Sequence, residues 1–545
     1  MHKSRRRSIA GVLVALAILS AWLVSPAVAG EKTTEMVAMR DGVKLATDVY
    51  LPEGDGPWPV VLLRTPYNKN SMNGDAHNEQ GYAVVIQDVR GRFESGGFDN
   101  VFADDGWNVR LDGYDTVEWV AAQPWCTGKI GTLGGSALAI TQYLMACTAP
   151  PNLTCQVAVV GAADFYHQTT YQGGVFRESM MVGWTNLQKT SYRVPVWLSH
   201  PNYDSFWVNY DCTLRYPLAT APCVHVGGWY DIFTQGTIDS FVGLQSDGGK
   251  GARGTQKLIM GPWTHGVGKR RQGQLEYPEN SVFDLGTYEQ RWFKHWLKGE
   301  DSGIMDEPAV NYYAMGDVDD PSAPGNEWRT AESWPPESAV TPYYLRADGL
   351  LSTAKAGTEL PDAFRFDPGD PVPTEGGQNL LIPSGPMDQR ALAERDDVLK
   401  YVTDVLAQPV EVTGHIYAEL WASSNVRDTD WTMKLVDIYP DGREMLVTDG
   451  IIRSRFRNTF RKPMLMQPGA IYQFRIDLWS TSLVFNKGHR IGIHVSSSNS
   501  PRFQVNPNNG EPQGSGTGQL IATNTVYHDK DHPSHILLPV VVPGK

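Results

Sequence analysis

The sequence predicts an α/β domain built on a mostly parallel sheet, followed by a β-sandwich domain. Short and almost wholly apolar runs recur between residues 59 and 260, and runs of this kind are typical of strands buried on both faces of a parallel sheet. After about residue 330 helical periodicity largely disappears, and Pro- and Gly-rich turns separate strand-like segments. A chain of 545 residues is long enough for two or more domains.

The predicted sheet begins with a hairpin over residues 36–50, in which Asp41-Gly42 supplies the turn. Helical patterns at 114–122 and 139–145 alternate with the apolar runs, and this alternation predicts a doubly wound α/β domain made of residues 32–162 and 221–330. A later helix presents one apolar face through Tyr288, Trp292 and Trp296. The predicted strands are 59–63, 83–86, 130–133, 155–160, 224–226 and 258–260.

Residues 163–220 interrupt this alternation. They are rich in Tyr, Trp, Gln and Gly and contain no evident strand run. Because the segment lies between two predicted strands, we expect an inserted cap over the strand ends. Residues 331–545 form the predicted β-sandwich, with strands at 410–422, 432–439, 472–478, 490–496 and 536–542.

The first 29 residues have the pattern of an export signal. Lys3 and three arginines precede an apolar run over 9–24, and Ala27-Val28-Ala29 provides the small residues of a cleavage site. We expect a signal peptide over 1–29 and a secreted protein with no stable membrane anchor after cleavage. An uncleaved N-terminal anchor is the alternative, since the apolar run approaches the length of a short membrane span.

The net charge argues against a nucleic-acid partner, and the cysteines offer possible disulfides. Removal of residues 1–29 takes away four positive charges and no acidic residue, so the net charge changes from −13 to −17. Such a surface repels phosphate backbones, and no nucleic-acid partner is expected. Outside the cytosol, Cys147 with Cys155 and Cys212 with Cys223 are the favoured short-range disulfides, and buried free thiols are the alternative.

A candidate nucleophile lies between a predicted strand and a predicted helix. Gly134-Gly135-Ser136-Ala137 follows the run 130–133 and precedes the helix at 139–145. This is the strand–turn–helix context in which a serine hydroxyl is exposed at a sheet edge. The usual G-x-S-x-G pattern is not met, because Leu138 stands two residues after the serine. A glycine-flanked serine alone is more often a simple turn.

Two further polar residues follow predicted strands and decide the interpretation. Asp231 follows the run 224–226, and His265 follows the run 258–260. Doubly wound sheets place their functional groups at such strand ends. The chain order Ser, Asp, His is the order of α/β-hydrolases. The sequence therefore predicts an α/β-hydrolase fold with Ser136 as nucleophile, His265 as base and Asp231 as the acid that orients the base.

Several longer motifs accompany these three residues. They are Arg64-Thr65-Pro66-Tyr67, Asp88-Val89-Arg90-Gly91, Asp112-Gly113-Tyr114-Asp115-Thr116, Trp125-Cys126, Gly134-Gly135-Ser136, Gly228-Trp229-Tyr230-Asp231, Gly261-Pro262-Trp263-Thr264-His265, Gly488-His489-Arg490 and the run 497–503. Together these motifs resemble the cocaine-esterase-like (CocE/NonD) hydrolases, relatives of the X-prolyl dipeptidyl aminopeptidases and α-amino-acid ester hydrolases. The match runs from about residue 33 to the end, and the sandwich resembles the jelly-roll module of the family.

The resemblance implies an oxyanion hole made by the Tyr67 hydroxyl and the backbone N–H of Ala137. It implies no metal and no cofactor. The family commonly has tyrosine directly after the serine and glycine three residues after it, where this chain has Ala137 and Ala139. A backbone donor does not depend on its side chain, so the change affects the acyl pocket, which we expect to be roomier.

The resemblance also bears on the substrate. The α-amino-acid ester hydrolases hold the substrate ammonium with acidic residues close after the triad aspartate, but residues 232–234 are uncharged here. An ammonium buried there without a carboxylate would be costly. We therefore expect an apolar acyl site. Its predicted lining residues are Phe233, Trp263, Tyr171 and Phe176.

The expected activity is the cleavage of small carboxylic esters through an acyl-enzyme. Amide or peptide hydrolysis of the X-Pro dipeptidyl-peptidase type is the alternative. A non-catalytic surface- or carbohydrate-binding protein is the alternative from another class. A cluster of metal-ligand types, His528, Asp529, Asp531, His532 and His535, lies in sequence that resembles the ordinary closing strands of the family, so no metal site is expected. The sequence leaves the oligomeric state open.

Overall fold

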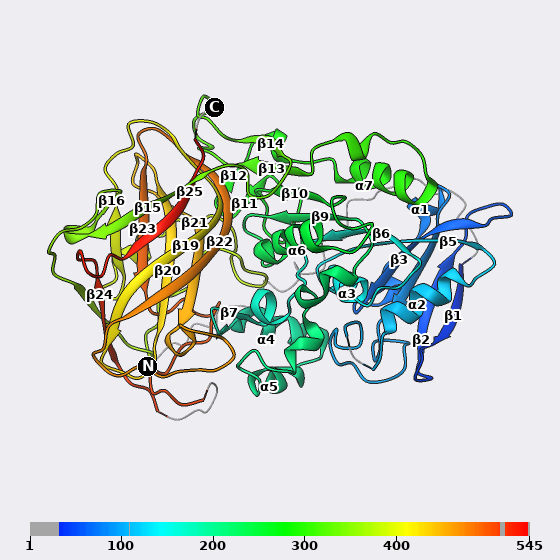
Figure 1. Cartoon of the computed structure of the whole chain (residues 1–545), viewed down its shortest axis with the longest axis horizontal. Helices are drawn as coiled ribbons and strands as arrows, with labels where there is room; N and C mark the ends of the chain where they lie inside the picture. The colour runs from blue at the N-terminus through cyan, green and yellow to red at the C-terminus, as the bar shows by residue number, and fades with distance from the viewer. Residues whose placement is uncertain (1–31, 108, 513–517, 543–545) are drawn as a thin grey trace, which may run out of the picture.

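A computed structural model describes residues 32–107, 109–512 and 518–542. The predicted signal peptide lies outside the described residues. Figure 1 shows the α/β domain and the β-sandwich side by side, with the helices of the cap between them at one edge. No helix in the described ranges is long and apolar enough to cross a membrane.

The α/β domain contains a ten-stranded sheet in the order β1-β2-β4-β3-β5-β6-β9-β10-β13-β14. The strands from β4 to β13 are parallel, and antiparallel strands close both edges. Every apolar run predicted as a strand lies on one of them. The strands are β1 Lys32–Ala38, β2 Lys44–Tyr50, β3 Trp58–Thr65, β4 Ala83–Asp88, β5 Cys126–Gly135, β6 Leu153–Val159, β9 Cys223–Gly228, β10 Lys257–Gly261, β13 Val310–Ala314 and β14 Glu327–Ala331.

The strands β13 and β14 were not predicted. Their sequences, VNYYA and EWRTA, contain polar and charged residues and lack an uninterrupted apolar run. β14 forms the edge of the sheet and is only half-buried, so its sequence does not need to be apolar. β13 lies inside the sheet and is mostly buried, but Asn311 interrupts its apolar residues.

Helices cover both faces of the sheet, as a doubly wound fold requires. One face carries α2 (Asp112–Ala121), α3 (Ala137–Ala146) and α6 (Thr234–Asp247). The other face carries α7 (Leu285–Phe293), whose Tyr288 and Trp292 pack into the core. The Asp284 carboxylate accepts the N–H of Thr287 and caps the start of α7. Short elements complete the domain: α1 Asp75–Asn78, β11 Arg271–Gln272 and β12 Leu275–Glu276.

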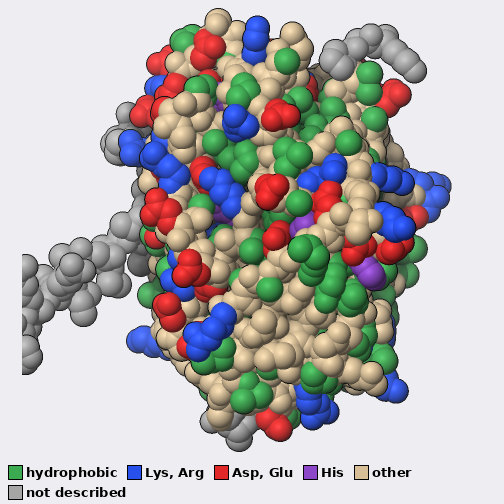
Figure 2. Space-filling view, turned by 90° about the vertical axis from the view of Figure 1, so that its left-hand side faces the viewer, with side chains coloured by type: hydrophobic (Ala, Val, Ile, Leu, Met, Phe, Trp, Pro, Cys, Tyr) green, Lys and Arg blue, Asp and Glu red, His purple; other side chains and the backbone are tan. Residues whose placement is uncertain are grey.

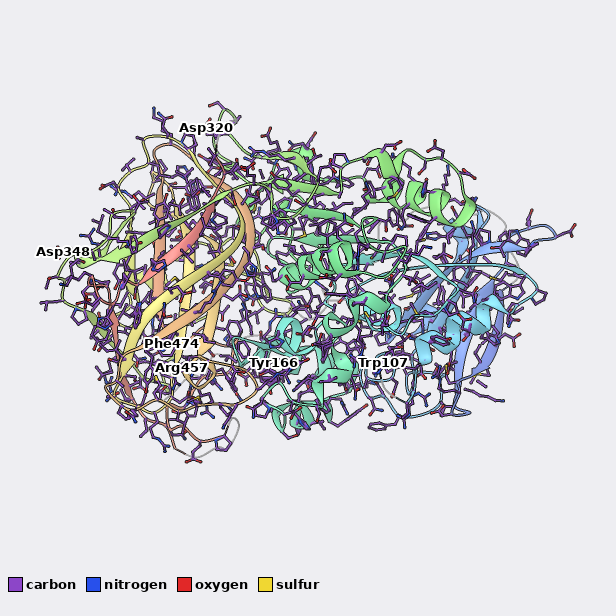
Figure 3. The ribbon with its side chains drawn as sticks, viewed as in Figure 1. Trp107, Tyr166, Asp320, Asp348, Arg457 and Phe474 are labelled. Carbon is purple, nitrogen blue, oxygen red and sulfur yellow. The ribbon has the colours of Figure 1, made fainter. Side chains whose placement is uncertain are left out.

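The inserted segment 163–220 packs around aromatic residues and carries two helices, α4 (Glu178–Gln188) and α5 (Arg193–Leu198). It also contains an unpredicted hairpin of β7 (Tyr171–Gln172) and β8 (Val175–Phe176). Two-residue strands are too short to leave a pattern in the sequence. Figure 3 shows Tyr166 of this segment between the two large domains.

The C-terminal domain is a β-sandwich whose strands are antiparallel except for the pair β16 and β18. Phe474 lies inside it and is fully buried (Figure 3). At the sandwich end of the molecule, acidic and basic side chains are interspersed (Figure 2). The elements are β15 Ala339–Arg346, β16 Leu350–Ser352, β17 Asp362–Phe366, α8 Arg390–Ala393, β18 Leu399–Val402, β19 Val410–Ser424, β20 Asp430–Ile438, β21 Glu444–Arg453, β22 Tyr472–Phe485, β23 Arg490–Ser496, β24 Ala522–Tyr527 and β25 His535–Val540.

The predicted disulfides are wrong, because the structure has five free cysteines. Cys147 packs in the core on one face of the sheet and Cys155 in the core on the other face, so the sheet separates them. Cys212 turns toward α3 rather than toward Cys223. Its sulfur lies 2.7 Å from the carbonyl oxygen of Tyr143, and the sulfur of Cys147 lies 3.7 Å from the carbonyl oxygen of Cys212.

The sandwich packs directly against the part of the α/β domain that carries Asp231. The hydroxyl of Tyr230 donates to the carbonyl of Leu446 at 3.2 Å, and the backbone N–H of Ser480 donates to Gln235 at 3.0 Å. Trp229 and Tyr230 belong to the same hydrophobic core as the sandwich strands. The C-terminal domain therefore supports the turn that follows β9.

Candidate active site

Ser136 occupies the turn between β5 and α3, with φ 59° and ψ −121°. A positive φ is strained for a residue other than glycine, and such strain typically occurs at functional positions. The turn also demands small neighbours. A Cβ on Gly134 would lie 2.4 Å from the Cβ of Leu138, and a Cβ on Gly161 would lie 2.5 Å from the Cβ of Ala139. Close packing explains the run of small residues around the serine.

Asp231 lies three residues after the end of β9 and is fully buried. The turn that places it needs Gly228, because a Cβ there would lie 2.2 Å from the carbonyl oxygen of Trp263. One carboxylate oxygen, Oδ1, accepts the backbone N–H of Phe233 at 2.8 Å. The other oxygen is free to accept from the histidine.

His265 follows β10 and joins the two other residues into one hydrogen-bonded row. Its Nδ1 lies 2.6 Å from Oδ2 of Asp231, and its Nε2 lies 2.9 Å from Oγ of Ser136. The His265 side chain is 7% exposed, so water competes little for these bonds. With the carboxylate on one nitrogen, the other nitrogen is positioned to take the proton of the serine hydroxyl.

The two predicted oxyanion donors come from α3 and from the loop that follows β3. Ala137 is the first residue of α3, so its N–H belongs to the helical turn whose donors have no partner within the helix. Tyr67 follows β3, and its hydroxyl accepts the indole N–H of Trp184 at 3.1 Å. Burial raises the pKa of Tyr67, whereas hydrogen bonding to Trp184 and to Ser136 acts in the opposite direction. The phenol therefore stays protonated and able to donate.

The predicted pocket residues lie in different surroundings. The Phe233 ring meets the His265 ring edge to face, with centroids 5.9 Å apart. Tyr171 and Phe176 form the core of the cap hairpin, and Trp263 packs against Trp328. These three side chains are at most 1% exposed, so their contact with substrate stays a prediction.

Trp184 and Arg92 were not predicted as site residues, although both contact the loop that carries Tyr67. Trp184 belongs to the cap helix α4, and Arg92 donates to the carbonyl oxygen of Pro66 at 3.1 Å. No strand end or glycine motif marks the tryptophan in the sequence. Only the docking of the cap onto the sheet edge brings it to the tyrosine.

The histidine-rich segment near the C-terminus serves the sandwich. His528 lies between Glu359 and Asp362, and His532 pairs with Asp529. Among the residues that the structure describes, no group of three or more His, Cys, Asp or Glu side chains is placed to hold a metal ion.

Most of the chain is similar to known proteins. Residues 41–196 and 186–267 match the model of the X-Pro dipeptidyl-peptidase (S15) family, and residues 302–537 match that of the X-Pro dipeptidyl-peptidase C-terminal non-catalytic domain. The cocaine esterase of Rhodococcus sp. (strain MB1 Bresler) is 35% identical over 578 residues, which cover 93% of this chain and 98% of the esterase.

Two solved structures share the architecture of both domains. An aminopeptidase from a Thaumarchaeota archaeon of marine sediment has a TM-score of 0.82 at 26% identity, over 94% of this chain and 96% of its own. An α-amino-acid ester hydrolase has a TM-score of 0.81 at 24% identity, over 96% and 99% of the two chains. The fold is thus an α/β-hydrolase fold with a C-terminal β-sandwich. The chain belongs to the CocE/NonD family of serine hydrolases, which act on ester or amide bonds.

Proposed function

We propose that this enzyme cleaves carboxylic esters through an acyl-enzyme formed on Ser136. The serine oxygen attacks the carbonyl carbon of the ester while Nε2 of His265 takes the hydroxyl proton. Collapse of the tetrahedral intermediate breaks the bond to the alkoxide, which receives that proton from the imidazolium. Water then attacks the acyl-enzyme by the same route and releases the acid. Asp231 holds the imidazole in the required tautomer and stabilises its charged form.

The observation that carries this proposal is the hydrogen-bonded row itself. Three residues from three strand ends meet with bonds of 2.6 Å and 2.9 Å, and Asp231 and His265 are buried while Ser136 is half-buried. The Tyr67 hydroxyl and the Ala137 N–H are the proposed donors to the oxyanion. The loss of one such donor in other enzymes costs about 2.7–4 kcal/mol of transition-state stabilisation.

Ester cleavage is favoured over aminopeptidase activity by the charges near Asp231. Residues 232–234 are uncharged and buried. The guanidinium of Arg177 donates to the carbonyl oxygen of Ile232 at 2.9 Å, so a positive charge already lies against this segment. A substrate ammonium placed there would meet repulsion instead of a carboxylate. An alkoxide is also a better leaving group than an amine.

A panel of chromogenic substrates tests this proposal. It contains p-nitrophenyl acetate, butyrate, octanoate and benzoate beside X-Pro and amino-acid p-nitroanilides, with the Ser136→Ala variant as the blank. We expect kcat/KM to be higher for at least one ester than for every anilide. A higher value for an X-Pro anilide would replace the esterase proposal with a dipeptidyl-peptidase. The absence of turnover and of covalent labelling by a fluorophosphonate would favour a non-catalytic binding protein.

We also propose that residues 1–29 direct export and are then removed. The basic start, the apolar run and Ala27-Val28-Ala29 support this proposal. N-terminal sequencing of the protein recovered outside the cells of an expression host should begin at Gly30. Recovery of the full-length chain in the membrane fraction would support an uncleaved anchor instead.

A further inference from the structure

The Tyr67 hydroxyl has a neighbour that can only donate to it. An indole N–H is a hydrogen-bond donor without acceptor capacity, whereas a phenol hydroxyl has one donor and two acceptor positions. The 3.1 Å contact between Trp184 and Tyr67 therefore uses a lone pair of the phenol oxygen. The phenol proton must point away from the indole. On the remaining side, Ser136 is close enough to affect the pKa of Tyr67.

The same contact strengthens the phenol as a donor. Hydrogen bonds in a chain polarise one another, so an oxygen that accepts a bond donates its own proton more readily. Burial raises the pKa of Tyr67 and weakens it as an acid, and the bond from Trp184 opposes this effect. The indole bond thus reverses part of the rise in the pKa of Tyr67 that burial causes, and keeps the hydroxyl a stronger donor.

Trp184 also packs against the loop between β4 and α2. Its ring packs against Phe102, with centroids 5.7 Å apart. Arg92 ties the helix that carries Trp184 to the loop that carries Tyr67. Its Nε donates to the Pro66 carbonyl at 3.1 Å, and its terminal nitrogens donate to the carbonyl and side chain of Gln188 at 2.7 Å and 3.1 Å.

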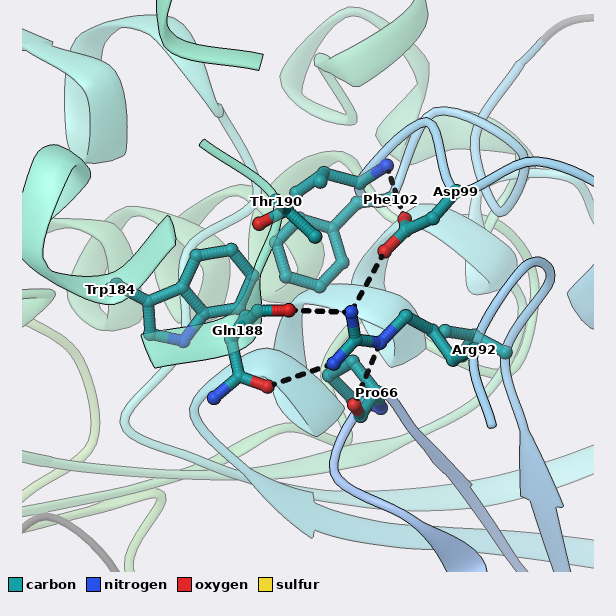
Figure 4. Close-up of a pocket in the computed structure, with 9 residues that line it drawn as sticks. Pro66, Arg92, Asp99, Phe102, Trp184, Gln188 and Thr190 are labelled. Carbon is teal, nitrogen blue, oxygen red and sulfur yellow. Dashed lines mark hydrogen bonds and ion pairs between the residues drawn. The ribbon is translucent and has the colours of Figure 1, made fainter. Parts of the chain in front are cut away.

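Figure 4 shows this arrangement, with Arg92 between Pro66 and Gln188 and with Trp184 beside Phe102. Pro66 directly precedes Tyr67, and Gln188 is the last residue of α4. A carboxylate oxygen of Asp99 lies 3.6 Å from the guanidinium. One side chain thus sets the distance between the cap helix and the tyrosine loop.

We propose that Trp184 is a positioning residue of the oxyanion hole, which orients and polarises the Tyr67 hydroxyl from the cap. The inference rests on the proposed function, in which Tyr67 donates to the oxyanion. It makes the docking of α4 part of the catalytic apparatus. Trp184 acts through Tyr67 and does not donate to the oxyanion itself.

A double-mutant cycle on the full chain tests the inference. Trp184→Phe, Tyr67→Phe and the double variant are compared with wild type on the best p-nitrophenyl ester of the panel. Loss of the indole bond should lower kcat roughly 3- to 15-fold, the effect of one hydrogen bond, with KM changed less than about twofold. In the Tyr67→Phe background the same substitution should change kcat less than about twofold, because the hydroxyl on which it acts is gone.

Trp197→Phe is the matched control. Trp197 is a buried cap tryptophan whose indole N–H has no hydrogen-bond partner among the described residues, and its ring packs against Phe165. Its substitution removes the same atoms from the cap without touching Tyr67. We expect Trp197→Phe to change kcat by the same factor in the wild-type and in the Tyr67→Phe background.

The outcomes separate this inference from the proposed function. Equal factors for Trp184→Phe in both backgrounds would overturn it, since the tryptophan would then act only through packing. Full activity of Tyr67→Phe would overturn it as well. Full activity of Ser136→Ala would instead remove the proposed function. Stoichiometric fluorophosphonate labelling of the Tyr67, Trp184 and Trp197 variants, all of which keep Ser136, verifies that these proteins are folded.

Discussion

The residues at the carboxyl ends of the parallel strands, called the edge below, and the residues of the cap are positioned by different means. At the edge, Ser136, Asp231 and His265 each stand in a short turn after a buried strand, and glycines at Gly134 and Gly228 make room for the turns. In the cap, position is set by mutual packing of aromatic side chains. The tyrosines, tryptophans and Phe165 contact one another in many orientations.

The difference indicates that the strand ends carry the reacting groups and that the cap contributes mainly to stability. Parallel strands bring their carboxyl ends to one edge, so polar residues there are arranged by the sheet itself. The cap contributes apolar burial, and its most direct contact with the candidate site is the bond from Trp184 to Tyr67. Substitutions at the edge should therefore change rates, and substitutions inside the cap should first change stability.

The largest expected effect is at the edge. Replacement of Asp231 by Asn keeps the size of the side chain but favours the wrong tautomer of His265, and kcat should fall about 10⁴-fold. Steady-state kinetics on a p-nitrophenyl ester measure this loss. A fall of less than tenfold would show that the aspartate does not orient the base. It would contradict the expectation that substitutions at the strand ends act mainly on the rate.

The cap should respond differently. Phe165 is 2% exposed and packs against Trp197, Trp207 and Tyr210. Replacement by Ala removes most of these contacts and leaves a cavity, so the free energy of unfolding should fall by about 3–5 kcal/mol. Urea denaturation of the two proteins gives this difference. A change below about 1 kcal/mol would mean that the cap is not held by its aromatic core.

The interior of the sheet should give the smallest effect. Burial lowers the pKa of His225 on β9 to about 4, and its ring lies between Tyr143 and Gln256. In the unfolded chain this histidine has a pKa near 6.5. The free energy of unfolding therefore has its full value above that pH and decreases as the pH falls toward 4. The free energy of unfolding decreases by roughly 3 kcal/mol over this range. His225→Gln should remove this part of the pH dependence, and identical urea midpoints against pH for both proteins would contradict it.

The sequence was most informative where structure is local. Buried strands appear as apolar runs, and each of Ser136, Asp231 and His265 follows such a run, so both the sheet and the meeting of these three residues could be predicted. The strands β13 and β14 could not, because Asn311 interrupts the short apolar run of β13 and the half-buried edge strand β14 does not require an apolar sequence. The role of Tyr67 was suggested only by family resemblance.

The remaining errors and omissions arise from long-range packing. The predicted cysteine pairs are near in sequence, but the sheet separates Cys147 from Cys155. Trp184 lies 117 positions from its hydrogen-bond partner, and no local motif marks it. Contacts between an inserted segment and the sheet are decided by tertiary docking, which neither periodicity nor spacing records.

Covalent labelling tests the reactive centre most directly. The intact mass of wild-type protein treated with a fluorophosphonate should increase by one phosphonyl group, peptide mapping should place that group on Ser136, and Ser136→Ala should show no increase. An active wild-type enzyme that stays unlabelled, or that carries the group on another residue, would contradict a nucleophile activated by His265.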